Sequence, residues 1–431
     1  MHFILPNQNI RYCPDTSAEL EEARQNIVNG KDIVDNQSYD DVYMFHPGAQ
    51  LRIEQKNHVP TDYFRYTNYE TAETGVVYTD RNGTWERTTF TSQTDDVTIT
   101  KISKSSKDKK VNVTLSMDEI SSFANYGDGN EVDLKYKKLT NDDGDYLAFV
   151  AHYPNYENSE LKNGGYSTVA YIICEGGTKK VNYDTVAKID QYVGENNPVI
   201  KITNADNVYV VVASDRTVEM GMYDDFNSQT DFELVDKLVD KTKDVAEKYS
   251  KNGTFSYESA LKNHTDIFTP QYNAVEFTLN DTVSTLSNER LILKQKFKKQ
   301  LTPELLEKAY YSGRYAQLCS SGVSTQRLYG MWTGEWCASW GSKYTMDANV
   351  NLQTSSMNTG NVECAPIGYV NFILHQVSDW EENALATHGF TDAIQAPVHT
   401  DGEMAGLVEH TVQELNVDEN GMLNVAPYEV E

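Results

Sequence analysis

Short runs of alternating apolar and polar residues fill the first half of the chain, with clusters of Gly, Asn and Asp between them. A period of two residues predicts strands that bury one face, and frequent turns favour an antiparallel sandwich. Val208–Ala213 is apolar throughout, which is typical of a strand buried on both faces. We therefore predict a β-sandwich domain over residues 1–227, with one helix near residues 18–28. The alternating runs are Val97–Ile102, Val111–Leu115 and Val199–Thr203.

Near residue 228 the apolar residues begin to recur with the period of a helix, about 3.6 residues. Between Asp231 and Lys251 they fall on one helical face, with charged residues between them. The segment Tyr257–Tyr272 has a second pattern of this kind. We interpret residues 228–300 as a helical linker. The apolar positions of the first helix are Leu234, Leu238, Val245 and Tyr249.

A different set of helices is predicted after residue 300. Thr302 can cap a helix N-terminus, Pro303 suits the first helical position, and Glu304 favours the positive end of the helix dipole. A stripe of small residues follows, which would let another helix approach closely. The stripe consists of Ala309, Gly313, Ala316 and Ser320.

A further helix is expected to open at Pro366 and to stop at Gly389, a residue that favours the end of a helix. Long helices joined by irregular, aromatic and polar loops indicate an α/α barrel. We assign residues 301–431 to the N-terminal part of an (α/α)6 barrel, so the predicted fold class is multidomain β + α. The apolar face of this helix comprises Ile367, Val370, Leu374 and Val377.

Charge excludes two classes of partner. The chain has 37 basic and 64 acidic residues, giving a net charge of −27. Nucleic acids and anionic membrane surfaces both require a basic face, so neither is expected as a partner. The oligomeric state is left open by the sequence.

The N-terminal residues Met1–Pro6 contain a four-residue apolar run with no basic segment before it, unlike a signal peptide. No window approaches the roughly 20 apolar residues that a membrane helix needs. We expect an extracellular or cell-surface protein if the full-length gene encodes a signal peptide, and a cytoplasmic one otherwise. The five cysteines form no C-x-x-C pair, so no metal site and no cofactor are predicted.

Three of the five tryptophans fall within nine residues, at Trp332, Trp336 and Trp340. Their spacing of four would give a core stripe on a helix. Glycines lie before, between and after them, and glycine is unfavourable inside a helix, which favours a loop lining a cleft. Aromatic rings can stack on the C–H faces of sugars, so these tryptophans are candidate substrate-binding residues.

Asn349 and Asn351 follow the tryptophans. In an extended segment both amides would point to the same side. An amide cannot act as a general base, but its carbonyl oxygen can orient a water molecule. The alternative is a pair of solvent-facing or turn asparagines, and the neighbouring tryptophans favour the catalytic role.

Two further acidic regions are candidates for sugar recognition. The stretch from His399 through Asp401 to Glu403 can be interpreted as metal ligands, a catalytic carboxylate pair or an ordinary polar turn. Asp347 and Glu335 lie beside aromatic residues and could recognise hydroxyl groups, or they could be surface charges. Without a further His or Cys cluster, metal binding is the least favoured of these readings.

The segment from 309 to 401 resembles glycoside hydrolase family 95, the α-L-fucosidases and α-L-galactosidases. The family's LQGIWN motif is similar to Leu328–Trp332, and its PPWGSDYxxNINLQ motif is similar to Ser339–Tyr344 followed by Asn349–Gln353. NLxEC is similar to Asn361–Cys364, and HNTDxWG to His399–Asp401. The ordered set of motifs is more specific than any one of them.

This resemblance implies hydrolysis of a terminal α-L-fucosyl or α-L-galactosyl linkage in an oligosaccharide or polysaccharide, with inversion at the anomeric carbon. It assigns the positioning of water to Asn349 and Asn351. Asp347, His399 and Asp401 are candidate substrate-binding residues. The family's general acid, a glutamate, and its partner aspartate are expected beyond Glu431, which would leave an incomplete barrel with exposed apolar helix faces.

The chain also departs from the family's motifs. Thr333 stands where the family has the asparagine of LQGIWN, and Ala338-Ser339 replaces the two prolines. Some side chains that face the substrate therefore differ from those of the family. The alternatives are a carbohydrate-binding protein without catalysis, an inactive fragment, and a structural or surface β-protein with an accessory helical region.

Overall fold

The computed structural model describes most of the chain between residues 45 and 400. The described residues are 2–6, 45–56, 59–105, 110–120, 135–152, 165–185, 196–216, 231–279, 284–322, 325–328, 332, 344–346, 348–388, 390–396, 399–400, 416–417 and 423–424. The helix predicted near residues 18–28 lies outside them.

The first half of the chain forms two antiparallel sheets. The smaller sheet has the order β1-β2-β7-β12-β11, with strands β1 (His2–Pro6), β2 (Phe45–Glu54), β7 (Val111–Asp118), β12 (Asn196–Ala205) and β11 (Thr178–Thr185). The larger sheet has the order β3-β4-β5-β6-β13-β10-β9-β8. Its strands are β3 (Asp62–Asn68), β4 (Glu73–Asp80), β5 (Gly83–Ser92), β6 (Val97–Lys104), β13 (Asn207–Arg216), β10 (Gly165–Glu175), β9 (Tyr146–His152) and β8 (Lys135–Thr140).

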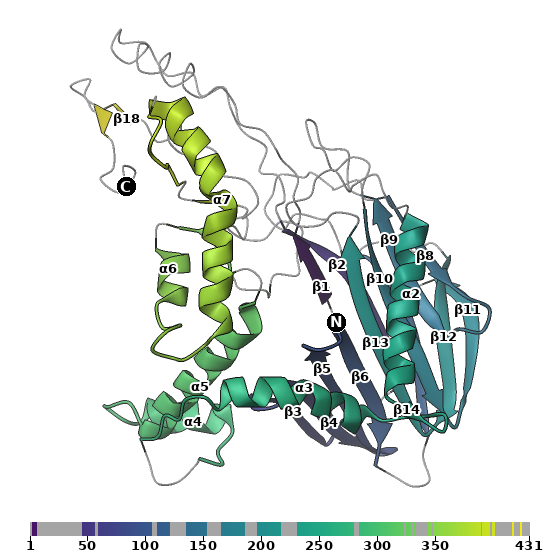
Figure 1. The fold of residues 1–431 in the computed structure, drawn as a ribbon. Coiled ribbons are helices and arrows are strands. Elements are labelled where there is room, and N and C mark those ends of the chain that lie inside the picture. The colour runs from purple at the N-terminus through teal and green to yellow at the C-terminus, as the bar shows by residue number, and fades with distance from the viewer. Residues whose placement is uncertain are drawn as a thin grey trace.

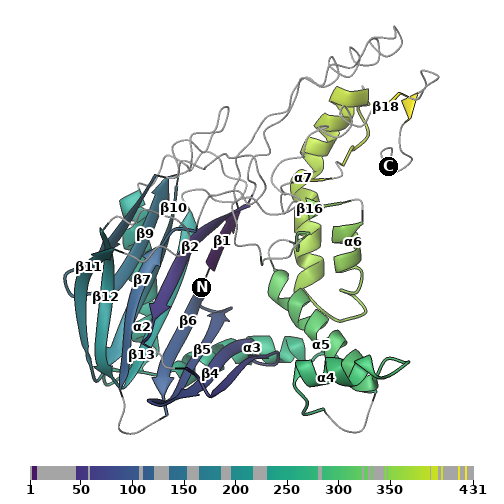
Figure 2. The ribbon, with the colours of Figure 1, turned by 180° about the vertical axis from the view of Figure 1, so that it is seen from behind.

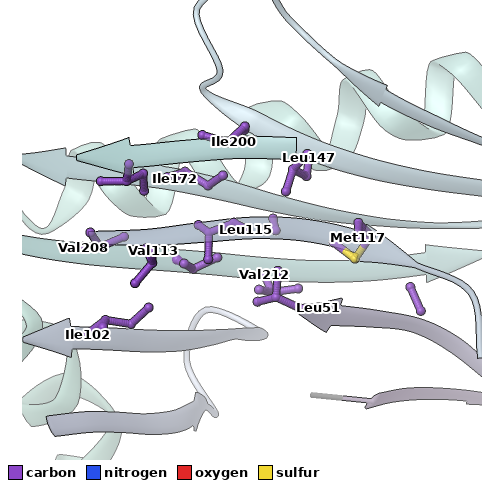
Figure 3. Packing of buried hydrophobic residues seen from close by; sticks show 14 of the residues in the cluster. Leu51, Ile102, Val113, Leu115, Met117, Leu147, Ile172, Ile200, Val208 and Val212 are labelled. Carbon is purple, nitrogen blue, oxygen red and sulfur yellow. The ribbon is translucent and has the colours of Figure 1, made fainter. Parts of the chain in front are cut away.

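The two sheets bury an apolar core between them (Figure 3). Alternating residues of β7 point into it, including Leu115, which is fully buried. Val208, Val210 and Val212 of β13 enter it from the other sheet, while Val211 faces the opposite side. The apolar run in β13 is therefore buried on both faces, as its sequence predicts.

Two helices cover the outer face of the eight-stranded sheet (Figure 1). Helix α2 (Asp231–Lys248) lies on β9, β10 and β13, and its buried Leu234 and Leu238 confirm the predicted apolar face. Helix α3 (Tyr257–Tyr272) begins after Ser256, whose side chain accepts a hydrogen bond from the Ser259 amide. A short hairpin, β14 (Ser250–Lys251) and β15 (Thr254–Phe255), joins the two helices.

The remaining helices stand beside the sandwich (Figures 1 and 2). Helix α4 (Asn288–Lys296) contacts α5 (Pro303–Ser320). Helix α5 starts with Pro303 after Thr302 as predicted, but the Thr302 side chain makes no capping hydrogen bond. In the predicted small-residue stripe Ser320 is buried, whereas Gly313 is exposed and a Cβ there would meet no described atom within 4 Å. Among the described residues no helix therefore packs closely at Gly313, which differs from the expectation.

Helix α7 (Cys364–His388) contacts α5 and the short helix α6 (Asn349–Thr354). The predicted helix is present, and its predicted apolar face is largely exposed, as expected for an incomplete barrel, while another side of the helix is buried. Ile367, Val370 and Leu374 are 59%, 50% and 66% exposed, whereas Phe372 and Trp380 are each 3% exposed. No described helix is both long and apolar enough to cross a membrane.

Candidate functional site

The asparagine pair lies at the start of α6. Ala348, just before the helix, has φ −149° and ψ −38°, so the helical conformation begins at Asn349. Residues two positions apart in the sequence of an α-helix project about 200° apart around its axis. Asn349 and Asn351 therefore do not project to one side, as they would in the extended segment considered from the sequence.

The Asn351 amide has an orientation set by two neighbours. Its Nδ2 donates a hydrogen bond to the Met346 carbonyl oxygen at 3.0 Å, and its Oδ1 accepts one from the Tyr369 hydroxyl of α7 at 3.2 Å. These two hydrogen bonds fix which end of the amide is the nitrogen donor and which is the oxygen acceptor. The side chain is exposed, and Oδ1 has a second lone pair with which to accept a hydrogen bond from water.

A two-residue ladder brings a distant part of the chain to this region. Strand β16 (Tyr344–Thr345) pairs with β17 (His399–Thr400), with Thr345 opposite His399. The backbone of His399 therefore lies beside the segment that leads into α6. The His399 side chain and Asp401 are outside the described residues, so their part in the site stays a prediction.

Of the three clustered tryptophans, the structure describes Trp332. Trp332 is 61% exposed, so its indole is accessible to a ligand. Trp336, Trp340 and Asp347 lie outside the described residues. Their gathering around the asparagines stays a prediction.

Glutamine side chains hold the end of α6 through hydrogen bonds, and none of these glutamines was predicted as a site residue. The amide of Gln326 and that of Gln317 in α5 both donate to the Gln353 carbonyl oxygen, at 3.0 and 3.2 Å. Gln353 in turn donates to the Leu328 carbonyl oxygen at 3.0 Å. Gln353 is the last residue of the Asn349–Gln353 motif. Its place in that motif is the feature of the sequence that could have identified it as part of the site.

Arg327 is a second residue that sequence reasoning missed. Its side chain is 1% exposed, and burial lowers its pKa to about 10 because the charged guanidinium loses its contact with water. The nearby Tyr344 of β16 opposes part of this shift. The buried Arg327 therefore places positive charge near Tyr344, in the strand that precedes α6.

Comparisons with known proteins agree with the order of domains. A family model described as "Glycosyl hydrolase family 65, N-terminal domain" matches residues 6–221, and one described as "Glycosyl hydrolase family 95 catalytic domain" matches residues 256–412. No curated protein matches the chain.

Two solved structures are similar at low identity. A protein assigned as a kojibiose phosphorylase, from the human microbiome, is 11% identical with a TM-score of 0.45, and the match covers 86% of this chain and 42% of that one. A bacterial glucoamylase complexed with acarbose is 13% identical with a TM-score of 0.41, over 83% of this chain and 47% of that one. The chain thus spans less than half the length of either protein.

The first of the two family models covers about half of the chain, and the second covers the helices that hold Asn349 and Asn351. The predicted fold class, an N-terminal antiparallel β-sandwich followed by helices of a partial (α/α)6 barrel, is confirmed. The chain belongs to the glycosyl hydrolase family whose model matches half of it, with a family 65 N-terminal domain at residues 6–221, and its residues 256–412 are similar to the family 95 catalytic domain.

Proposed function

We propose that the chain forms part of an inverting glycoside hydrolase that releases terminal α-L-fucosyl or α-L-galactosyl residues from oligosaccharides or polysaccharides. The supporting observation is the family 95 match over residues 256–412, which includes the oriented amide of Asn351. On this proposal residues 1–227 form the sandwich domain, 228–300 the linker and 301–431 the first part of the catalytic barrel.

The proposed role of Asn351 follows from its hydrogen bonds. With Nδ2 held by Met346 and Oδ1 facing Tyr369, the free lone pair of Oδ1 can hold the attacking water in one orientation. An amide does not take up the proton, so a carboxylate must act as the base. Inversion requires a general acid on the opposite side of the sugar, with the two carboxyl groups roughly 6.5–9.5 Å apart.

The other predicted residues would hold the sugar. The exposed Trp332 ring can stack on the C–H face of a monosaccharide. The backbone pairing of His399 with Thr345 puts the His399–Asp401 segment near α6, where its side chains could bind sugar hydroxyls. These roles for Trp332 and His399 are part of the proposal.

Hydrolysis of aryl α-L-fucosides and α-L-galactosides by the full-length protein, purified with the residues that follow Glu431, tests the proposal, with the anomer of the released sugar followed by NMR. We expect an inverted product and a loss in kcat of about 100-fold or more for Asn351→Ala, because the water loses its orientation. The control Asn358→Ala changes an exposed asparagine in the turn after α6 and should retain activity. Binding of the sugars without any turnover would instead support the non-catalytic carbohydrate-binding function.

A further inference from the structure

A groove of about 1520 Å³ lies on the sandwich domain, away from α6. Its floor is the inner face of β3, β4, β5 and β6, and its far wall is the segment Thr285–Glu289 at the start of α4. Lys308 of α5 and Leu51 and Ile53 of β2 add to the lining. Phe64, Tyr66, Tyr69 and Gly75, at the edge of the sheet, also line the groove. None of the residues of the candidate glycosidase site lines this groove.

The inner face of the eight-stranded sheet changes from apolar to polar at this groove. One row of cross-strand partners runs from Val208 through Ile102 to Arg87, Val76 and Arg65. Ile102 and Val208 belong to the core between the sheets, whereas Arg87 is half-buried and Arg65 is exposed. The row therefore continues past the edge of the core with charged side chains on the core-facing side of the sheet.

The neighbouring row of cross-strand partners also changes from apolar to polar residues at the groove. It runs from Val210 to Thr100, Thr89, Thr74 and Thr67, so four successive strands each present a threonine. Thr89 and Thr100 share a hydrogen bond of 2.9 Å between their hydroxyl oxygens. Thr67 and Thr74 are exposed. A sheet face with this composition suits a polar ligand better than an apolar one.

The register of the edge strand β3 is fixed from its other face. The Tyr66 ring lies across Gly75, where a Cβ would come within 2.3 Å of the ring, and the Tyr66 hydroxyl donates to Glu73 at 3.2 Å. Since side chains alternate along a strand, this contact keeps Arg65 on the core-facing side of the sheet, while Tyr66 lines the groove from the other side of β3. Tyr63, which is 60% exposed, lies on the same side as Arg65.

The charge of the groove is opposite to that of the chain. Among the described residues that line it, Arg65, Arg87 and Lys308 are basic and Glu289 is the acidic one. The whole chain has 64 acidic residues against 37 basic ones. Arg65 and Arg87 lie two strands apart, so their backbones are about 10 Å from each other. This spacing lets them bind two separate anionic groups.

We propose that this groove binds an acidic oligosaccharide, whose sugars carry carboxylate or sulfate groups. Arginine binds both anions through two parallel hydrogen bonds, which accounts for Arg65 and Arg87. In the threonine row the exposed Thr67 and Thr74 have hydroxyl oxygens that can accept hydrogen bonds from sugar hydroxyls, although the Thr74 hydroxyl itself donates to the Thr89 carbonyl oxygen. The exposed Tyr63 ring can stack on a sugar face. An acidic peptide would use the arginines but would have no counterpart to the threonine row.

Calorimetric titration of the purified protein tests this site with three carbohydrate probes and with polyglutamate as an acidic peptide. The carbohydrate probes are an oligogalacturonate, its neutral methyl ester and a sulfated oligosaccharide of similar length. We expect at least one acidic carbohydrate probe to bind, and to bind more tightly than polyglutamate, and the methyl ester not to bind. The double variant Arg65→Gln/Arg87→Gln should weaken that binding roughly tenfold or more, because two charge-assisted hydrogen-bonding groups are lost. Comparison of the two acidic carbohydrate probes decides between carboxylate and sulfate.

A matched control is the double variant Lys180→Gln/Lys201→Gln, which removes two exposed charges from neighbouring strands of the other sheet. It should bind like the unmodified protein, and so should Asn351→Ala, which tests the hydrolase proposal separately. Circular dichroism shows whether each variant is folded, and Arg65→Lys provides a milder change. Equal weakening in the lysine control, equal binding of the methyl ester or of polyglutamate, or no binding of either acidic probe would overturn the proposal.

Discussion

His264 is a buried histidine where the sandwich meets the helices. Its side chain is 1% exposed, and its ring lies between those of Phe90 and Phe268, with ring centroids 5.5 and 5.3 Å away. Its Nδ1 accepts a hydrogen bond from the Gln93 amide at 3.3 Å. Burial lowers the pKa of His264 because the imidazolium cannot be hydrated there. The folded chain therefore selects the neutral ring.

This selection makes stability depend on pH. Because the folded pKa lies below the usual 6.5, the unfolded chain takes up the proton first as pH falls. The contribution of His264 is complete above about pH 6.5 and decreases below it. Urea unfolding at pH 7.5 and 5.5 should show a smaller loss of stability for His264→Phe than for the unmodified chain. The control His375→Gln, at an exposed position of α7, should keep the original loss, and equal losses in all three proteins would contradict the assignment.

At the same scale, the sequence located the asparagine pair but not its neighbours. Asn349 and Asn351 belong to a motif, so their identity was visible without coordinates. Tyr369 is 18 residues beyond Asn351 on another helix, and its hydrogen bond depends on how α6 and α7 lie together. Arg327 has a residue type that is almost always exposed, so its burial also could not be predicted from local pattern.

At the scale of the element, apolar periodicity located the helices and predicted the buried face of α2. The predicted limits Tyr257–Tyr272 are those of α3, where the Ser256 side chain caps the first turn. In α7 the periodicity grouped Ile367 with Leu374, and both are exposed, as expected for the apolar faces of an incomplete barrel. Periodicity shows which residues share a face, whereas the position of neighbouring elements decides which face is buried. The buried face of α7 instead includes Phe372, whose ring centroid is 4.5 Å from that of Tyr344.

Two substitutions in α7 compare its buried face with its exposed apolar face. Phe372→Ala should destabilise the helical region by about 3–5 kcal/mol, because it leaves a cavity beside Tyr344 and Val350. Leu374→Ala removes a side chain that is 66% exposed and should change stability by no more than about 0.5 kcal/mol. Urea unfolding followed by circular dichroism compares the two. A larger effect of Leu374→Ala than of Phe372→Ala would mean that α7 buries the face that contains Leu374.

At the scale of the whole molecule, α3 belongs to two cores. Its Tyr257 and Ala260 pack with the sandwich and α2, whereas Phe268 and Tyr272 pack with α5. Arg314 of α5 strengthens the second contact, since its guanidinium donates to the carbonyl oxygens of Gln271, at 2.6 Å, and Tyr272. Helix α3 therefore packs both on the sandwich and on the helical region. Because the two regions share this helix, they should unfold together.

Replacement of Phe268 by alanine should make the sandwich and the helical region unfold separately. Phe268→Ala deletes a side chain that is 2% exposed, at a cost of about 3–5 kcal/mol, in the half of α3 that packs on α5. Hydrogen exchange in increasing urea, followed by mass spectrometry, can compare peptides from β13 with peptides from α7. We expect exchange of the α7 peptides to begin at lower urea in the variant, with little change for β13. The control Ile267→Ala, at the adjacent and 44% exposed position, should leave both sets of peptides exchanging together. If Phe268→Ala shifted β13 and α7 by the same amount, the two regions would be a single cooperative unit that does not depend on α3.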